Sequence, residues 1–132
     1  MSVAVTGPYA GLLGLVFIGL NIRVIRNRTR AKVSLLDGGD EALRRALRVH
    51  GNFAEYVPFA LLLMALAEIQ GASGLYMHLL GTVLIVCRLS HAYAITAKTG
   101  RSPARVIGVV ETFGVIIATA GHAIYRFAAA GV

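Results

Sequence analysis

The chain has 132 residues, of which 57% are hydrophobic and 14% charged, and its mean hydropathy is +0.72. This composition is too apolar for an ordinary soluble domain and is typical of a protein that crosses a membrane several times. The length allows one domain, residues 1–132, of about four helices. Cys87 is the only cysteine, so no intramolecular disulfide can form, and it is too isolated to indicate a metal site.

Four helices are expected in chain order, over approximately residues 8–30, 41–70, 73–98 and 102–129. Asp40 is a suitable N-cap for the second helix, and Pro103 suits the first turn of the fourth. Each helix is long enough to cross a hydrocarbon core of about 30 Å. The sequence therefore predicts an all-α fold, an integral membrane four-helix bundle.

The net charge of +7 is distributed unevenly along the chain. Eleven of the 13 basic residues surround the first and third loops, and the second loop, residues 71–74, has none. This pattern predicts that loops one and three are cytoplasmic and that both termini lie on the other side of the membrane. Basic loops of this kind set topology and contact anionic lipids, so we expect no nucleic-acid partner.

Charged and amide side chains interrupt the second expected helix at membrane depth. At 100° per residue, they fall within one narrow stripe; its members are Glu41, Arg44, Arg45, Arg48, Asn52 and Glu55. A bilayer tolerates such a stripe only where it faces other helices or a wet cavity. The third helix adds Arg88 and His91, and the fourth adds Glu111. Helices packed side by side could bring these groups into one cluster near the cytoplasmic leaflet.

Two interpretations of these polar residues are open. The first is an internal salt-bridge network, with Arg48–Glu55 and Arg88–Glu111 pairs, and we favour such local contacts for Glu111 and His50. The second is a ligand site, which we favour for the set Arg23, Arg48, Asn52, Glu55 and Arg88. Buried cations there outnumber the acids, so the pocket favours an anionic ligand, and the planar fork of arginine suits carboxylates.

The spacing Arg48-x-His50-x-Asn52-Phe53-x-Glu55-x-x-Pro58 resembles the second-helix signature of the MAPEG family, the membrane-associated proteins in eicosanoid and glutathione metabolism. Supporting similarities are Arg23 at the end of the first helix, the segment Arg88-Leu89-Ser90-His91, and Arg101-x-Pro103-x-Arg105. The loop Gly38-Gly39-Asp40 is most similar to the small bacterial inner-membrane branch of the family.

This resemblance implies a homotrimer in a bacterial inner membrane, with glutathione as co-substrate between neighbouring protomers on the cytoplasmic side. The residues implied to bind it are Arg23, Arg48, Asn52, Glu55, Arg88 and His91, and those implied to act on its thiol are Arg105 and Arg88. The thiolate would attack an apolar electrophile arriving from the membrane lipid, or reduce a hydroperoxide. One position departs from the family, because Ile95 stands where relatives carry a glutathione-contacting tyrosine.

Two other functions compete with this hypothesis. One is a non-catalytic membrane protein that binds a lipid or thiol ligand, and the other is a small anion transporter. A small cation exporter is disfavoured, because such proteins use an acidic residue in the first helix and this one has none there.

Overall fold

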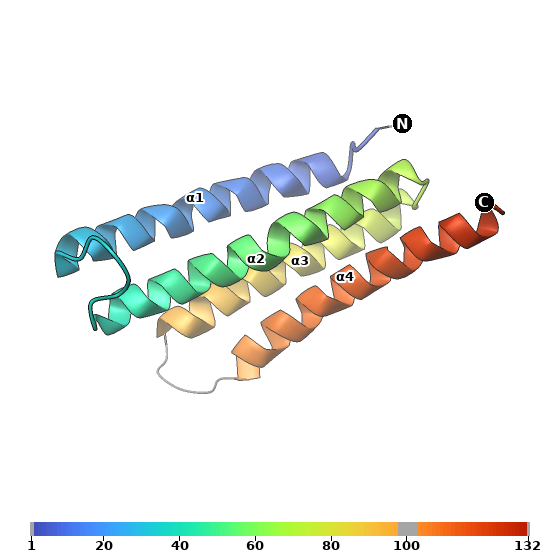
Figure 1. Ribbon diagram of the computed structural model, residues 1–132. Helices are drawn as coiled ribbons and strands as arrows, with labels where there is room; N and C mark the ends of the chain where they lie inside the picture. The colour runs from blue at the N-terminus through green and yellow to red at the C-terminus, as the bar shows by residue number, and fades with distance from the viewer. Residues whose placement is uncertain (1, 98–102, 132) are drawn as a thin grey trace.

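The computed structural model describes residues 2–97 and 103–131, with side chains at 2–95 and 110–131 (Figure 1). Its four helices are α1 (Thr6–Ala31), α2 (Glu41–Ile69), α3 (Gly74–Ala97) and α4 (Pro103–Ala129). The prediction of an all-α, four-helix architecture is confirmed. The helix limits expected from the sequence lie within two residues of these bounds.

The helices run roughly alongside one another, with α2 and α3 between α1 and α4 (Figure 1). Both α1 and α4 contact α2 and α3, whereas α1 and α4 do not touch in the described part of the chain. The two termini and the α2–α3 turn lie at one end, and the α1–α2 loop lies at the other. The basic loop is therefore separated from the termini by the length of the bundle.

The core forms where α2 packs on its neighbours. Ala60, Met64 and Ala67 follow the i, i+4, i+7 spacing of one helix face, and all three are fully buried against residues such as Met77 and Leu84. The outer surface is also apolar: Leu15, Leu75 and Ile117, for example, are at least 70% exposed. An apolar exterior of this extent requires lipid as its solvent.

Three helices are long and apolar enough to cross a membrane, judged on the described residues: Thr6–Ala31, Glu41–Ile69 and Gly74–Ile95.

At the end of the bundle that holds the termini, the Glu68 carboxylate from α2 accepts hydrogen bonds from the backbone N–H groups of Val5 and Thr6, both at 2.7 Å. No side chain of α1 caps this terminus itself. Glu68 therefore satisfies the exposed donors of α1 and ties α1 to α2.

A second link joins α1 to α3. The Tyr9 hydroxyl lies 3.1 Å from both His78 Nδ1 and Thr82 Oγ1. The Tyr9 ring rests on Gly81, where a Cβ atom would lie only 2.5 Å from ring carbons. Glycine at position 81 therefore lets the aromatic ring of α1 approach the backbone of α3.

Ion pairs fix the α1–α2 loop at the opposite end. Arg30 pairs with Asp40 at 2.7 Å, and Arg44 pairs with Asp37 at 2.6 Å. Asp40 also caps α2, since its carboxylate accepts from the Leu43 N–H at 2.7 Å, as the sequence predicts. Leu36 adopts a left-handed backbone conformation with φ of 56°, a strained state for leucine. The loop is therefore an ordered structure over the start of α2.

Candidate functional site

Arg88 and Asn52 form the buried part of the site. The Arg88 guanidinium of α3 donates from Nη1 to Asn52 Oδ1 of α2 at 2.8 Å. Arg88 is only 2% exposed and Asn52 only 6% exposed. His91, one turn further along α3, is buried as well. The structure thus joins two of the predicted site residues, Arg88 and Asn52, inside one protomer, where a hydrogen bond compensates the desolvation of a charge, and it buries His91 one turn away.

Arg48 and Glu55 lie on the outside of the same helix. They line a hollow of about 470 Å³. This surface, called here the charged hollow, consists of Leu36, Asp37, Arg44, Leu47, Arg48, Gly51 and Glu55. Leu36 and Asp37 come from the α1–α2 loop, and the other five residues come from α2. The loop therefore forms one wall of the hollow.

The polar stripe of α2 does not face the other helices along its full width, contrary to the expectation from the sequence. From Arg48, Asn52 lies about 40° to one side and Glu55 about 20° to the other, at 100° per residue. Asn52 consequently falls on the edge that packs against α3, and Arg48 and Glu55 fall on the open side. A protomer alone therefore leaves two opposite charges uncovered at membrane depth.

The Arg48–Glu55 ion pair of the alternative interpretation does not form in the described part of the chain. The two residues are seven positions apart, or about 10 Å along the helix axis. The neighbouring charges of α2 are already engaged, Arg44 with Asp37 and Arg45 with Glu41. Arg48 and Glu55 consequently remain available to a ligand or to another chain.

Glu111 and His50 make local contacts, as the interpretation favoured for them expects. The Glu111 carboxylate, assigned to Arg88 in that interpretation, accepts a hydrogen bond of 2.6 Å from Cys87 Sγ. The His50 ring stacks on Phe17 with a centroid distance of 4.9 Å. These contacts join α3 to α4 and α1 to α2, so both residues serve the packing of the bundle.

The remaining predicted residues are distributed as follows. Arg23 is half-buried on α1 and does not line the charged hollow. The Arg105 side chain lies outside the described residues. Ile95 is 4% exposed and belongs to the interior, whereas Tyr93 is 74% exposed, so Tyr93 cannot substitute for the tyrosine that the family resemblance implies at position 95.

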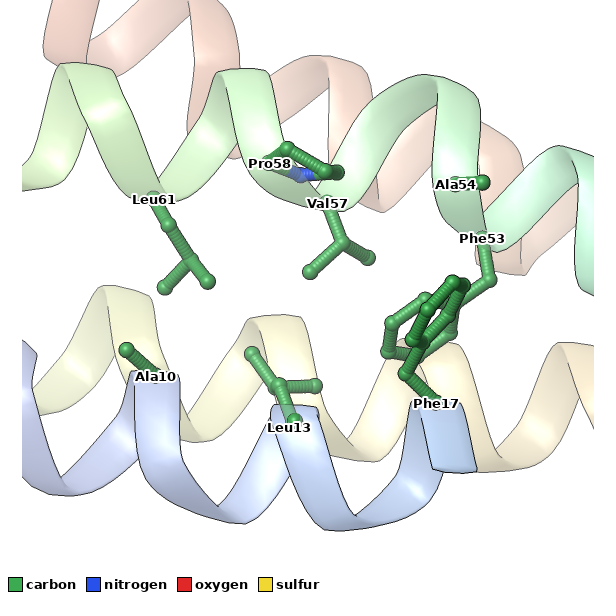
Figure 2. Close-up of a pocket in the computed structure, with 9 residues that line it drawn as sticks. Ala10, Leu13, Phe17, Phe53, Ala54, Val57, Pro58 and Leu61 are labelled. Atoms are coloured by element: carbon green, nitrogen blue, oxygen red, sulfur yellow. The ribbon is translucent and has the colours of Figure 1, made fainter. Parts of the chain in front are cut away.

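An apolar groove next to the hollow was not predicted from the sequence. It has a volume of about 230 Å³ and opens between α1 and α2. Its lining, called here the apolar groove, is Ala10, Leu13, Gly14, Phe17, Phe53, Ala54, Val57, Pro58 and Leu61 (Figure 2). Figure 2 shows Leu13 and Phe17 pointing from α1 toward Val57 and Phe53 of α2. The sequence feature that could have indicated a gap between helices is Pro58, because a proline inside a helix disturbs its regular geometry.

The wall of the charged hollow that the α1–α2 loop forms was also not predicted from the sequence. The turn residues Asp37, Gly38 and Gly39 indicate a loop, but the contact of Asp37 with Arg44 follows no helical spacing. Tyr56 of α2 was likewise not predicted as a packing residue, and its ring packs on Phe113 of α4 with 5.4 Å between ring centroids.

Comparisons with known proteins show what this chain is similar to. The model of the MAPEG family matches residues 6–125. The chain is 39% identical over 89 residues to "Inner membrane protein YecN" of Escherichia coli K12, which covers 67% of this chain and 68% of the relative. The protein of that name from Escherichia coli O6:H1 strain CFT073 matches to the same extent. No solved structure matches significantly.

The family match includes α1, α2 and α3 completely and most of α4. It contains the Arg88–Asn52 pair, the charged hollow and the apolar groove. Relatives of this similarity are inner membrane proteins, in agreement with the apolar exterior of the bundle. The chain is therefore a member of the MAPEG family.

Proposed function

We propose that this protein binds glutathione and activates its thiol for transfer to apolar electrophiles or for the reduction of hydroperoxides. The observation that carries the proposal is the pair Arg48 and Glu55, two opposite charges that face one hollow and lack an ion partner within the described protomer. Glutathione carries two carboxylates and one ammonium. A guanidinium and a carboxylate facing the same hollow are complementary to such a ligand.

The site is proposed to be completed by a second copy of the chain in a homotrimer. Charges on the outer face of a membrane helix are costly unless protein or water covers them. A neighbouring copy would cover the charged hollow and could supply its own Arg23, which does not line the hollow of its own protomer. The buried part of the site, Arg88 with Asn52, would then support the inner side of the shared pocket.

The chemistry proposed is thiolate formation. A free thiol with a pKa near 8.5 is only a few per cent ionised at pH 7. Lowering that pKa by about two units makes most of it thiolate and requires about 2.7 kcal/mol of differential stabilisation. Arg88 and Arg105 are the cations proposed to supply this field. In the transfer reaction, the thiolate sulfur forms a bond to carbon, and the leaving group departs with its electron pair.

In the peroxide reaction, the thiolate sulfur attacks the terminal oxygen of the hydroperoxide, so that an S–O bond forms, the O–O bond breaks, and the alkoxide leaves and takes up a proton to become the alcohol. The thiol of a second glutathione then attacks the sulfur of the resulting sulfenic acid, which forms the disulfide and releases water. Ile95 supplies no hydroxyl that could donate to sulfur in either transition state. Loss of one such donor is worth roughly 10²-fold in rate, so activity is expected to be modest.

Calorimetric titration of the full-length protein in mild detergent tests the binding step. Arg48→Ala should weaken glutathione binding by more than tenfold, because a desolvated charge contact is worth about 2–5 kcal/mol. Arg126→Ala is the matched control, since Arg126 is exposed in the last turn of α4 and should not change the affinity. Equal affinities of the wild type and Arg48→Ala would exclude the charged hollow as the glutathione site.

The ultraviolet absorbance of bound thiolate tests the chemical step. At pH 7 and saturating glutathione, the wild type should show a thiolate band that free glutathione lacks. A protein that binds glutathione without this band would instead be a non-catalytic ligand-binding protein. Ile95 is the observation that favours this second candidate, since an aliphatic side chain stands where relatives have a hydroxyl.

A further inference from the structure

We propose that Arg44 is a third ligand-binding charge of the charged hollow, and that the Asp37 carboxylate occupies it in the free protein in place of a ligand carboxylate. Binding then exchanges an internal carboxylate for an external one and releases the α1–α2 loop from α2. That the ligand is glutathione rests on the proposed function, whereas the exchange itself follows from the charges and contacts of the hollow.

The charges that line the hollow do not match the proposed ligand while Asp37 is in place. The lining contains two cations, Arg44 and Arg48, and two acids, Asp37 and Glu55, so its formal charge is zero. Two carboxylates and one ammonium are complemented by two cations and one acid. Asp37 is the charge in excess, and it has the sign of a ligand carboxylate. The hollow therefore becomes complementary to such a ligand when Asp37 leaves Arg44.

Arg44 and Arg48 are placed to hold two carboxylates of one molecule. They are four residues apart on α2, and residues at this spacing are neighbours on one face of a helix, about 6 Å apart along its axis. Both side chains line the same hollow. A ligand with two anionic groups can therefore contact both guanidinium groups at once.

The contact between Asp37 and Arg44 is one that a ligand can replace. Arg44 donates to Asp37 Oδ2 through Nε, at 2.6 Å. The Arg44 side chain is 61% exposed, and within the described residues no ion pair uses its Nη1 or Nη2 group. A ligand carboxylate can accept from two guanidinium N–H groups, which is a stronger arrangement than a single contact. An exposed ion pair contributes little to stability, so its exchange costs little.

The backbone of Leu36, directly before Asp37, supports a switching role of the loop. Leu36 is left-handed with φ of 56° although it is 75% exposed, so packing of its side chain does not impose this conformation. Its carbonyl accepts from Arg28 Nη1 at 3.0 Å. Asp37 is held by the Gly39 N–H at 2.9 Å and by Arg44. Strained residues persist only where their surroundings fix them, and they are common at ligand clamps and switches. Loss of the Arg44 contact removes one of these constraints.

Calorimetric titration of the full-length protein with glutathione in mild detergent tests the exchange. Asp37→Asn keeps the size of the side chain and removes its charge. It should tighten glutathione binding by roughly threefold, because no internal ion pair has to be broken first. Asp40→Asn is the matched control. It removes the same charge from the same loop, but Asp40 pairs with Arg30 and does not line the hollow. Asparagine also caps a helix as well as aspartate does, so this variant should bind glutathione as the wild type does.

A double variant shows whether the effect of Asp37 acts through Arg44. Arg44→Ala should weaken glutathione binding by roughly tenfold, because a charge-assisted contact to the ligand is lost. Adding Asp37→Asn to Arg44→Ala should bring no gain. A gain equal to that in the wild-type background would overturn the inference, because the effect of Asp37 would then be one of general charge. Unchanged affinity of Arg44→Ala would overturn it as well.

A second probe separates this inference from the proposed function. Glutarate is a dicarboxylate without thiol or ammonium, and saturation-transfer NMR detects its binding. It should bind Asp37→Asn more tightly than the wild type, and the double variant should lose this gain. That pattern in a protein that binds no glutathione would support the exchange at Arg44 and refute the proposed function. Glutathione binding that is insensitive to both Asp37→Asn and Arg44→Ala would refute the exchange alone.

Discussion

Arg88 of α3 donates a buried hydrogen bond to Asn52 of α2, at 2.8 Å between Nη1 and Oδ1. This bond completes one half of the candidate site within the protomer. The other half, Arg48 and Glu55, faces outward from the same helix. The division has experimental consequences, because the two halves should respond differently to substitution.

Asn52→Ala should lower the thermal stability of the protein. The substitution removes one acceptor of a buried guanidinium, and loss of a partner by a buried polar group costs about 1–3 kcal/mol. Arg48→Ala should lower the melting temperature less, because Arg48 forms no ion pair within the described protomer and its removal there leaves no buried partner behind. Thermal unfolding in detergent, followed by circular dichroism, measures both. A larger loss for Arg48→Ala than for Asn52→Ala would contradict the assignment of a structural role to the Arg88–Asn52 bond.

Glu68→Ala should destabilise the end of the bundle at which α1 begins. The variant leaves the N–H groups of Val5 and Thr6 without their acceptor, and loss of a helix cap costs about 0.5–2 kcal/mol. Glu68→Gln should lose less stability, because its amide oxygen can still accept one of the two bonds. The measurement is chemical or thermal unfolding of the three proteins. Identical stabilities of Glu68→Ala and the wild type would show that the cap contributes nothing.

The α1–α2 loop should loosen only in acid. The Gly39 N–H and then Arg44 lower the pKa of Asp37 below its ordinary 3.8, and the Leu43 N–H is the largest cause of the lowered pKa of Asp40. A carboxyl pKa that is lower in the folded chain than in the unfolded chain stabilises the folded loop at every pH above the unfolded pKa. This contribution is present at neutral pH and is lost as the pH falls below 3.8 through the folded pKa values.

A spin label on Ser34→Cys, in a Cys87→Ser background, measures this transition as label mobility against pH. The label should stay immobile from pH 7 to 4 and become mobile at lower pH. Asp37→Asn is the control, since it should increase mobility already at pH 7 by removing the ion pair with Arg44. A transition centred above pH 5 in the wild type would be incompatible with the lowered carboxyl pKa values.

Both termini are predicted to face away from the cytoplasm. The basis is the concentration of basic residues around the first and third loops. Figure 1 places the termini at the end of the bundle opposite the α1–α2 loop. A membrane-impermeant thiol reagent on intact cells should therefore label Ser2→Cys and spare Ser34→Cys, both in a Cys87→Ser background. The reverse labelling pattern would place the charged hollow on the outer side of the membrane.

The protein is predicted to be a trimer in mild detergent. Arg48 and Glu55 are exposed in the protomer, and a neighbouring chain would shield them from lipid. Native mass spectrometry should detect three chains. A monomer that binds glutathione with undiminished affinity would show that the site needs no second copy.

The sequence by itself determined the helices and the position of the polar stripe. Long apolar runs, the cap at Asp40 and the basic loops act locally, so spacing alone predicts four helices and places Arg48, Asn52 and Glu55 on one side of α2. The motif around Asn52 also identified the family, because it combines several uncommon polar residues at fixed helical spacing within a membrane segment.

Only the tertiary structure decided which of those residues face inward. A stripe spans tens of degrees around a helix, and the angle at which α3 and α4 pack decides where its edge becomes buried. Asn52 thus meets Arg88, whereas Glu55, about 60° away around the helix, remains outside. The apolar groove depends likewise on how α1 and α2 pack, because its lining comes from both helices. Such features arise from contacts between segments far apart in the chain, which local periodicity does not encode.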